Sequence, residues 1–124
     1  ATIHMALLGA EGLARVAAAC HANTAALTGR LTAIAGVEPL FSGAVFHEQA
    51  LRLPAPAADV LRSLAAHNLL GGHDLGAQYP ELGHAVLVCA TEKRTEQEMD
   101  AYAQKLERVL RARTEAGCPV QPKI

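Results

Sequence analysis

An alanine-rich amphipathic segment over residues 11–35 determines much of what this chain can form. Its larger apolar residues recur every seven positions, at Leu13, Cys20, Leu27 and Ile34, and alanines cover the flanks of this stripe. Alanine is the best helix former, and an apolar repeat of this kind is typical of a helix. Small side chains on the flanks let other elements approach closely from more than one side. The pattern therefore predicts a long helix that is packed between other elements.

Two glycines near the start divide this helical region. Ile3 to Leu8 is a short apolar stretch, and Gly9 and Gly12 lie between it and the long helix. Because glycine weakens a helix interior, we expect two helices joined at the glycine pair. The chain is already in a helical pattern by Ile3, as if cut from something longer. We therefore expect a fragment, and interpret residues 1–35 as interdomain linker helices.

After the long helix the pattern changes to short segments. The predicted elements are strands at 37–41, 46–53 and 85–90, a short helix ending near residue 67, and a last helix that follows residue 95. With so few strands, helices on one side of a small antiparallel sheet are the economical packing. We predict a small α+β domain over residues 36–113, with a three-stranded antiparallel sheet backed by helices. Residues 114–124, with two prolines and a glycine, predict a flexible tail.

Individual residues indicate the position of one strand and the boundaries of two helices. Pro39 has no backbone N–H to donate, so its strand is expected at a sheet edge. Asn68 follows the short helix and suits a left-handed cap. Thr95 and Glu98 have the spacing of a capping box, which predicts that the last helix begins just after Thr95.

Composition excludes some classes of partner. The chain has 11 Lys and Arg against 12 Asp and Glu, and it has no Trp, two Phe and two Tyr. It therefore lacks both the positive charge and the aromatic platforms that bind nucleic acid. Three cysteines without CxxC spacing favour a reduced, cytoplasmic compartment. No continuous apolar run reaches the roughly 20 residues that span a bilayer, so no membrane contact is expected.

The chain shows no complete catalytic site. Its six histidines match no zinc-ligand spacing on a helix or a strand, so we predict no metal site. Cys20 and Cys89 lie in apolar patterns that do not favour a thiolate. The lysines lie in polar contexts, whereas a lysine that forms a Schiff base needs an activating environment. We predict no catalytic and no cofactor-binding residue.

Segment 70–84 is the one long irregular stretch, with four glycines and a proline. Loops of this length inside a small domain are usually functional. A second candidate region is the turn that follows the apolar strand 85–90. The candidate cleft-lining residues are His73, Asp74, Tyr79, Glu92 and Arg94. The alternative interpretation is that segment 70–84 is a solvated loop and that the charges of the turn have no role in a cleft. The sequence leaves both interpretations open.

Several motifs together carry a family resemblance. They are Leu-Leu-Gly-Ala-Glu-Gly-Leu (7–13), Gly-Val-Glu-Pro-Leu-Phe-Ser-Gly (36–43), Phe-His-Glu (46–48), Leu-Gly-Gly-His-Asp-Leu-Gly (70–76), Tyr-Pro-Glu-Leu (79–82) and Thr-Glu-Lys-Arg-Thr (91–95). With them the chain resembles the carboxyl-terminal part of glycine dehydrogenase (decarboxylating), the P-protein of the glycine cleavage system. The resemblance is to its subunit 1 or amino-terminal half, and it extends to about Leu110.

The resemblance implies the small carboxyl-terminal domain of a fold-type I enzyme that depends on pyridoxal phosphate, preceded by the linker helix. In this family the cofactor accepts the electrons left when glycine loses carbon dioxide, and the aminomethyl group passes to the lipoyl arm of the H-protein. In this family the cofactor lysine belongs to the large domain of the other subunit, and this chain has no match for it. The fragment is therefore expected to shape the cleft rim, to bind no cofactor and to be inactive alone.

The implied partners are glycine dehydrogenase subunit 2, or the other half of a fused P-protein, and the lipoylated H-protein, in a cytoplasmic heterotetramer. We also expect the isolated fragment to self-associate through the apolar flank of its helix. Two alternatives remain open. One is the small domain of another fold-type I enzyme such as an aminotransferase, and the other is an independent α+β ligand-binding or interaction module.

Overall fold

The computed structural model describes residues 1–116 of the chain. Its four strands form one antiparallel sheet in the order β1-β2-β4-β3. The α+β class is therefore confirmed. The elements in chain order are α1 (Thr2–Thr32), β1 (Glu38–Pro39), β2 (Glu48–Arg52), α2 (Ala57–Ala66), β3 (His73–Asp74), a 3₁₀ turn (Pro80–Leu82), β4 (Ala85–Cys89) and α3 (Glu96–Ala116).

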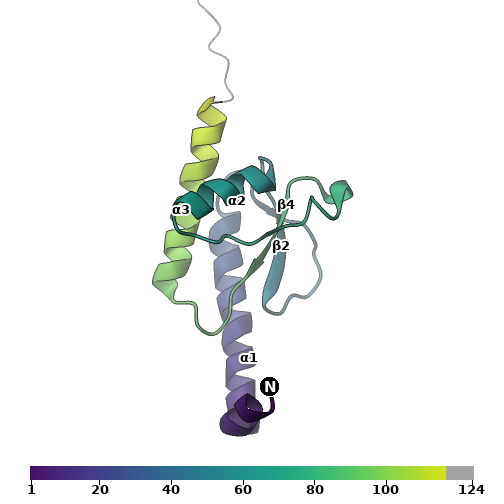
Figure 1. Cartoon of the computed structure of the whole chain (residues 1–124), viewed down its shortest axis with the longest axis vertical. Helices are drawn as coiled ribbons and strands as arrows, with labels where there is room; N and C mark the ends of the chain where they lie inside the picture. The colour runs from purple at the N-terminus through teal and green to yellow at the C-terminus, as the bar shows by residue number, and fades with distance from the viewer. Residues whose placement is uncertain (117–124) are drawn as a thin grey trace, which may run out of the picture.

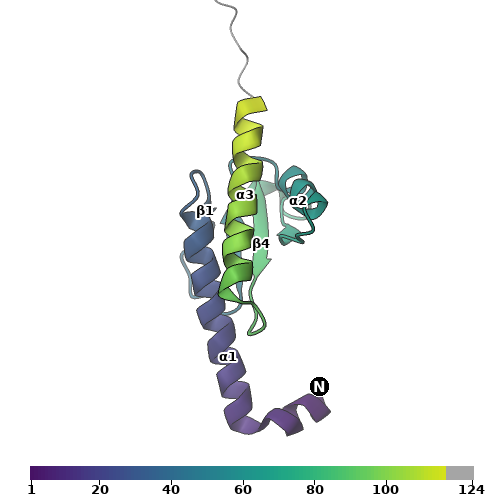
Figure 2. The same ribbon diagram turned by 90° about the vertical axis from the view of Figure 1, so that its left-hand side faces the viewer.

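The helices lie on one face of the sheet, with α3 between α1 and α2 (Figure 2). Strands β2 and β4 form the central pair, in which Leu51 lies opposite Val86. Because alternate strand residues point to opposite faces, Val88 is on the same side of β4 as Val86. All three are buried against the helices, where burial of apolar surface stabilises the two layers. Other core residues include Leu31, Val60, Leu64, Met99 and Leu106.

The sheet has one strand more than the three predicted. The additional strand, β3, comes from the glycine-rich segment 70–84 and pairs His73 with Leu87. Its two residues have neither alternating nor β-branched character, so the sequence pattern does not indicate a strand. The pairing depends on Gly72, whose φ is 143° and whose position brings the backbone against β4. A Cβ at Gly72 would lie 2.3 Å from the Leu87 carbonyl oxygen.

Helix α1 has two parts with different surroundings. Gly9, with φ 65° and ψ -178°, breaks the helical backbone, which confirms the predicted joint between two helices. Beyond the joint, Leu27 and Leu31 belong to the buried core. Before it, Ile3 and Leu7 are 78% and 83% exposed. The first part therefore forms an arm (residues 2–8) that projects from the body of the protein (Figure 1).

Helix α1 is also long and apolar enough to cross a membrane, with a mean hydropathy of 1.3 over 18 residues, of which 11% are buried. The prediction from the sequence considered only uninterrupted apolar residues, and these form no segment long enough to span a bilayer. The mean hydropathy of an 18-residue window is high here because the helix contains many alanines. A core helix of a water-soluble protein can meet the same criterion. The burial of Thr24, Leu27 and Leu31 shows that the carboxyl-terminal half of α1 packs in the core of this domain.

Two of the three predicted helix boundaries are confirmed. Asn68 has φ 58° just after α2, as expected for a left-handed cap. At the start of α3 the Thr95 amide donates to Glu98 Oε2 over 2.9 Å and the Glu98 amide to Thr95 Oγ1 over 3.2 Å, which confirms the capping box. The third boundary differs, because α3 continues to Ala116 rather than ending near residue 113. The rest of the predicted tail, 117–124, lies outside the described residues.

Candidate functional site

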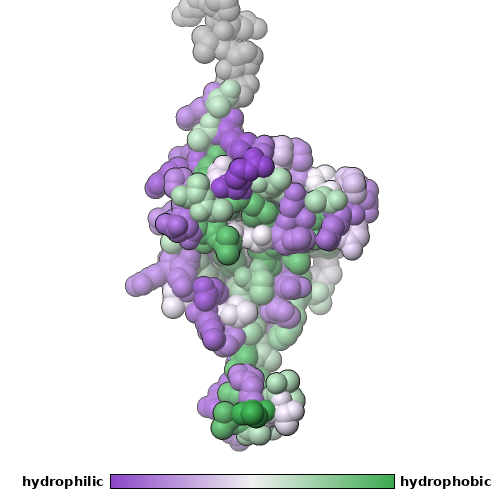
Figure 3. Space-filling view, viewed as in Figure 1, coloured by the Kyte–Doolittle hydropathy of each residue, from purple (hydrophilic) through white to green (hydrophobic). Residues whose placement is uncertain are grey.

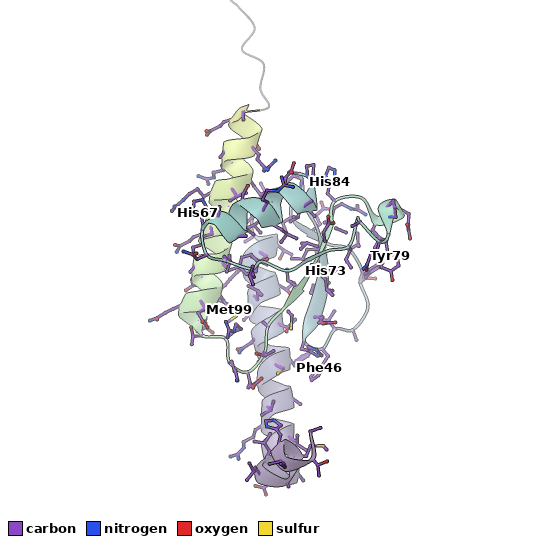
Figure 4. All side chains as sticks on the ribbon, in the orientation of Figure 1. Phe46, His67, His73, Tyr79, His84 and Met99 are labelled. Carbon is purple, nitrogen blue, oxygen red and sulfur yellow. The ribbon has the colours of Figure 1, made fainter. Side chains whose placement is uncertain are left out.

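A cleft of about 740 Å³ opens on the face shown in Figure 3, where apolar residues (green) are surrounded by hydrophilic ones (purple). It lies between the first half of α3, the segment 68–73 and the end of β4. Met99 of α3 and His73 of β3 both line it (Figure 4). The polar and charged lining residues are Glu48, Asn68, His73, Cys89, Thr91, Arg94, Glu98, Tyr102 and Lys105.

Two hydrogen bonds attach segment 67–71 to α3 and so shape this wall of the cleft. The hydroxyl of Tyr102 donates to the carbonyl oxygen of Gly71, and Lys105 Nζ donates to the His67 carbonyl oxygen over 2.9 Å. Burial of Tyr102 raises the pKa of its phenol, so the hydroxyl keeps its proton and remains a donor. A Cβ at Gly71 would lie 2.7 Å from a Leu64 methyl carbon, so this wall packs closely on α2.

Charges of both signs lie at the rim. Arg94 Nη1 is 3.4 Å from Glu98 Oε1. The backbone amide of Thr95, together with Arg94, lowers the pKa of the Glu98 carboxyl, so Glu98 is negative at neutral pH. The rim therefore holds a fixed ion pair at the start of α3, in which the Arg94 guanidinium is about half exposed.

Helix α1 holds the turn that carries Arg94. Thr24 Oγ1 donates to the Ala90 carbonyl oxygen over 3.0 Å. Asn23 Nδ2 donates to the carbonyl oxygens of Thr91 and Arg94, over 2.8 and 3.0 Å. The thiol of Cys20 is 3.4 Å from Glu92 Oε2. We call residues 90–94 the clamped turn, because side chains of α1 hold both of its ends.

An ion-pair cluster extends this attachment to α3. Arg30 Nε is 2.6 Å from Asp100 Oδ1, and its Nη2 pairs with Glu96. These carboxylates raise the pKa of the Arg30 guanidinium, with the Asp100 hydrogen bond as the largest cause. The pairs lie at the surface, where such interactions contribute little to stability. Their effect is to orient α3 along α1.

The structure brings two of the five candidate cleft-lining residues, His73 and Arg94, to the cleft. Asp74 instead accepts the Gly76 amide over 2.9 Å and closes its own turn. Tyr79 is 49% exposed and is absent from the lining of the cleft. Glu92 is absent from the lining and contacts Cys20.

Sequence reasoning missed most of the lining. Met99 and Tyr102 have the spacing of core residues on one face of a helix. Glu48 and Cys89 become neighbours only through the pairing of β2 with β4. Burial raises the pKa of the Cys89 thiol, and Glu48 and Cys20 raise it further. The thiol is therefore protonated at neutral pH, which disfavours Cys89 as a nucleophile.

Comparison with known proteins confirms the resemblance on which the sequence was interpreted. The chain is 58% identical over 110 residues to a protein from Methylococcus capsulatus described as a probable glycine dehydrogenase (decarboxylating) subunit 1. That match covers 89% of this chain and 24% of the relative. A protein of the same description from Thiobacillus denitrificans is 53% identical over an alignment of 122 positions, and that match covers 94% of this chain and 26% of the relative. The chain thus spans about a quarter of these curated relatives. No protein-family model matches it.

A solved structure gives the same result in three dimensions. A glycine decarboxylase (P-protein) of the glycine cleavage system, crystallised in inhibitor-bound form, matches with a TM-score of 0.82 and 31% sequence identity. The match covers 87% of this chain and 24% of that one. The chain is therefore similar, in sequence and in fold, to one part of a much longer enzyme.

Proposed function

We propose that this chain is the carboxyl-terminal part of subunit 1 of a glycine dehydrogenase (decarboxylating), in which it shapes the cleft rim. The observation that carries the proposal is the identity of more than half of the aligned residues with named subunit 1 proteins over almost the whole chain. In the complete enzyme, glycine would lose carbon dioxide and its aminomethyl group would pass to the lipoyl group of an H-protein. The relatives favour this function over the two alternatives considered from the sequence.

Pyridoxal phosphate would supply the electron sink of that reaction, but the described residues do not fit a site that holds it. A Schiff-base lysine needs an enclosed or otherwise activating environment. Lys93 is exposed, and the amine of Lys105 is bound to the His67 carbonyl oxygen at the protein surface. We therefore place the cofactor lysine in another part of the parent enzyme, and propose that this chain alone is not catalytic.

The chain's own contribution would be to position Arg94 and the wall 67–73. The clamped turn fixes the backbone of Arg94 to α1, so the guanidinium is presented at the rim with little loss of backbone freedom. Tyr102 and Lys105 hold the opposite wall. These bonds support a role as one side of a cleft whose remaining sides come from other parts of the enzyme.

The name subunit 1 implies a partner subunit in the relatives. We propose subunit 2 as that partner, in a cytoplasmic heterotetramer, and the lipoylated H-protein as the acceptor. For the isolated chain we propose self-association. The exposed apolar residues of the arm support this, and the arm is visible at the bottom of Figure 3.

The test is reconstitution of the reaction. Carboxyl-labelled glycine is incubated with pyridoxal phosphate, lipoylated H-protein and either the 124-residue chain or the complete subunit 1 together with subunit 2. Labelled carbon dioxide is expected only from the subunit pair. In the pair, Arg94→Ala should lower the rate, whereas Arg111→Ala, an exposed α3 residue outside the cleft, should not. Release by the 124-residue chain alone would contradict the proposed division of roles.

A further inference from the structure

Three side chains with metal-binding atoms meet at one end of the central strand pair. His47, Glu48 and Cys89 each offer one ligand atom, and these atoms lie within 4.8 Å of one another. In the described part of the chain, residues 1–116, this is the one group of three or more such residues that comes so close. Sequence spacing does not reveal it, because Cys89 lies 41 positions after Glu48 and meets it only through strand pairing.

The backbone explains why the three side chains converge. Glu48 and Cys89 are direct partners in the register of β2 with β4, so their side chains lie on the same face of the sheet. His47 would point to the opposite face if it continued the strand, but it lies in a bend just before β2. Its carbonyl oxygen accepts the Ala90 amide over 3.2 Å, which keeps the bend attached to the end of β4.

His47 has an incomplete hydrogen-bond set. Its Nδ1 atom is buried and has no hydrogen-bond partner within the described structure. An unpaired buried polar atom is costly, and native proteins rarely leave one without a partner. The rings of Phe46 and His47 pack in a T-shaped arrangement, with centroids 4.8 Å apart and an interplanar angle of 86°, which restrains the imidazole beside the carboxylate and the thiol. A cation bound through Nδ1 would give this atom its missing partner.

The donor set selects the kind of ion. One nitrogen, one oxygen and one sulfur atom suit Zn²⁺ and similar dications, whereas Mg²⁺ and Ca²⁺ prefer oxygen ligands alone. In a tetrahedral zinc site, bonds of about 2.0–2.3 Å place neighbouring ligand atoms about 3.5 Å apart. The trio therefore has to close by about 1 Å, which rotation of the two exposed side chains, Glu48 and Cys89, can supply.

We propose that His47, Glu48 and Cys89 bind a zinc-type dication, with Cys89 releasing its thiol proton to solvent as the sulfur–metal bond forms and with a fourth coordination position that opens toward the cleft. Glu48 and Cys89 both line the cleft, so solvent and small molecules reach the ion from that side. A site with three protein ligands and one open position is the arrangement that lets zinc bind a further donor atom. The proposal stands on this geometry alone and does not depend on the proposed enzyme function.

The test is metal binding by the 124-residue chain after dialysis against a chelator. Titration with Zn²⁺ by calorimetry, against a competing chelator, is expected to show one site. Titration with Co²⁺ is expected to give the near-ultraviolet absorption band of a cobalt–thiolate bond. Loss of an ion ligand should cost at least as much as loss of an outer-shell partner, so His47→Ala and Cys89→Ser should each weaken binding about tenfold or more.

Two variants serve as matched controls. His84→Ala and His4→Ala each remove an exposed histidine outside the trio, and both should bind Zn²⁺ as the unmodified chain does. Circular dichroism of each variant without metal shows whether the fold is kept. Equal affinity in Cys89→Ser and the unmodified chain, or a cobalt spectrum without the thiolate band, would overturn the proposal.

Discussion

The clamped turn can be tested with a single hydroxyl group. Thr24 is 1% exposed, and its Oγ1 is the donor to the buried Ala90 carbonyl oxygen. Thr24→Val keeps the shape and the β-branched character of the side chain but leaves that carbonyl unpaired. An unsatisfied buried acceptor costs about 1–3 kcal/mol, so the free energy of unfolding should fall by about that amount. Urea unfolding followed by circular dichroism measures this change.

The same helix offers a matched control one turn later. Thr28 Oγ1 is also buried, but it has no hydrogen-bond partner within the described structure. Thr28→Val therefore removes a hydroxyl that makes no hydrogen bond. It changes the side chain and the helix propensity in the same way as Thr24→Val does. Its free energy of unfolding should stay equal or rise. If the two variants lost stability equally, the cost would come from valine in α1 rather than from the bond to Ala90, and the reasoning would be refuted.

Three further predictions follow from individual residues. Gly72→Ala forces a Cβ into the β4 backbone at a φ of 143° and should destabilise the chain by about 3 kcal/mol or more, whereas Gly43→Ala, with nothing within 4 Å, should change little in the same urea titration. Glu98→Gln should be less stable than the unmodified chain at neutral pH. The folded pKa of Glu98 is depressed, chiefly by the hydrogen bond from the Thr95 amide, so the charge stabilises the fold above the ordinary pKa of 4.5. That contribution is lost as the pH falls through the folded pKa, and thermal melts of the two proteins should converge there; a constant difference at every pH would contradict the assignment. Leu7→Ser on the arm should lower the mass measured by light scattering if the proposed self-association uses the arm, and an unchanged mass would argue against that surface.

Local chemistry predicted the helical part of the fold well. The glycine joint in α1, the left-handed Asn68 and the capping box of Thr95 with Glu98 each depend on neighbours within a few residues, and each is found in the structure. The strands of the sheet were harder to predict from the sequence. Strand β3 has two residues and is defined by pairing with β4 and by the close approach of Gly72, which no window of sequence contains.

The site was predictable only in part for the same reason. Arg94 was predicted as a cleft-lining residue because it lies in the turn after the apolar strand 85–90. The bonds that hold its turn come from Asn23 and Thr24, about 70 positions earlier, on a helix whose repeat suggested only apolar packing. The trio of His47, Glu48 and Cys89 likewise requires both the register of β2 with β4 and the bend before β2.

The two-part construction of α1 has a mechanical consequence. From the joint at Gly9 to Thr24 the helix runs as a stiff rod of about 22 Å, at 1.5 Å per residue. Its far end is bonded directly to the loop that presents Arg94. A force that tilts the outer end would therefore be transmitted along the rod both to the loop that carries Arg94 and to the core in which Leu27 and Leu31 of α1 pack.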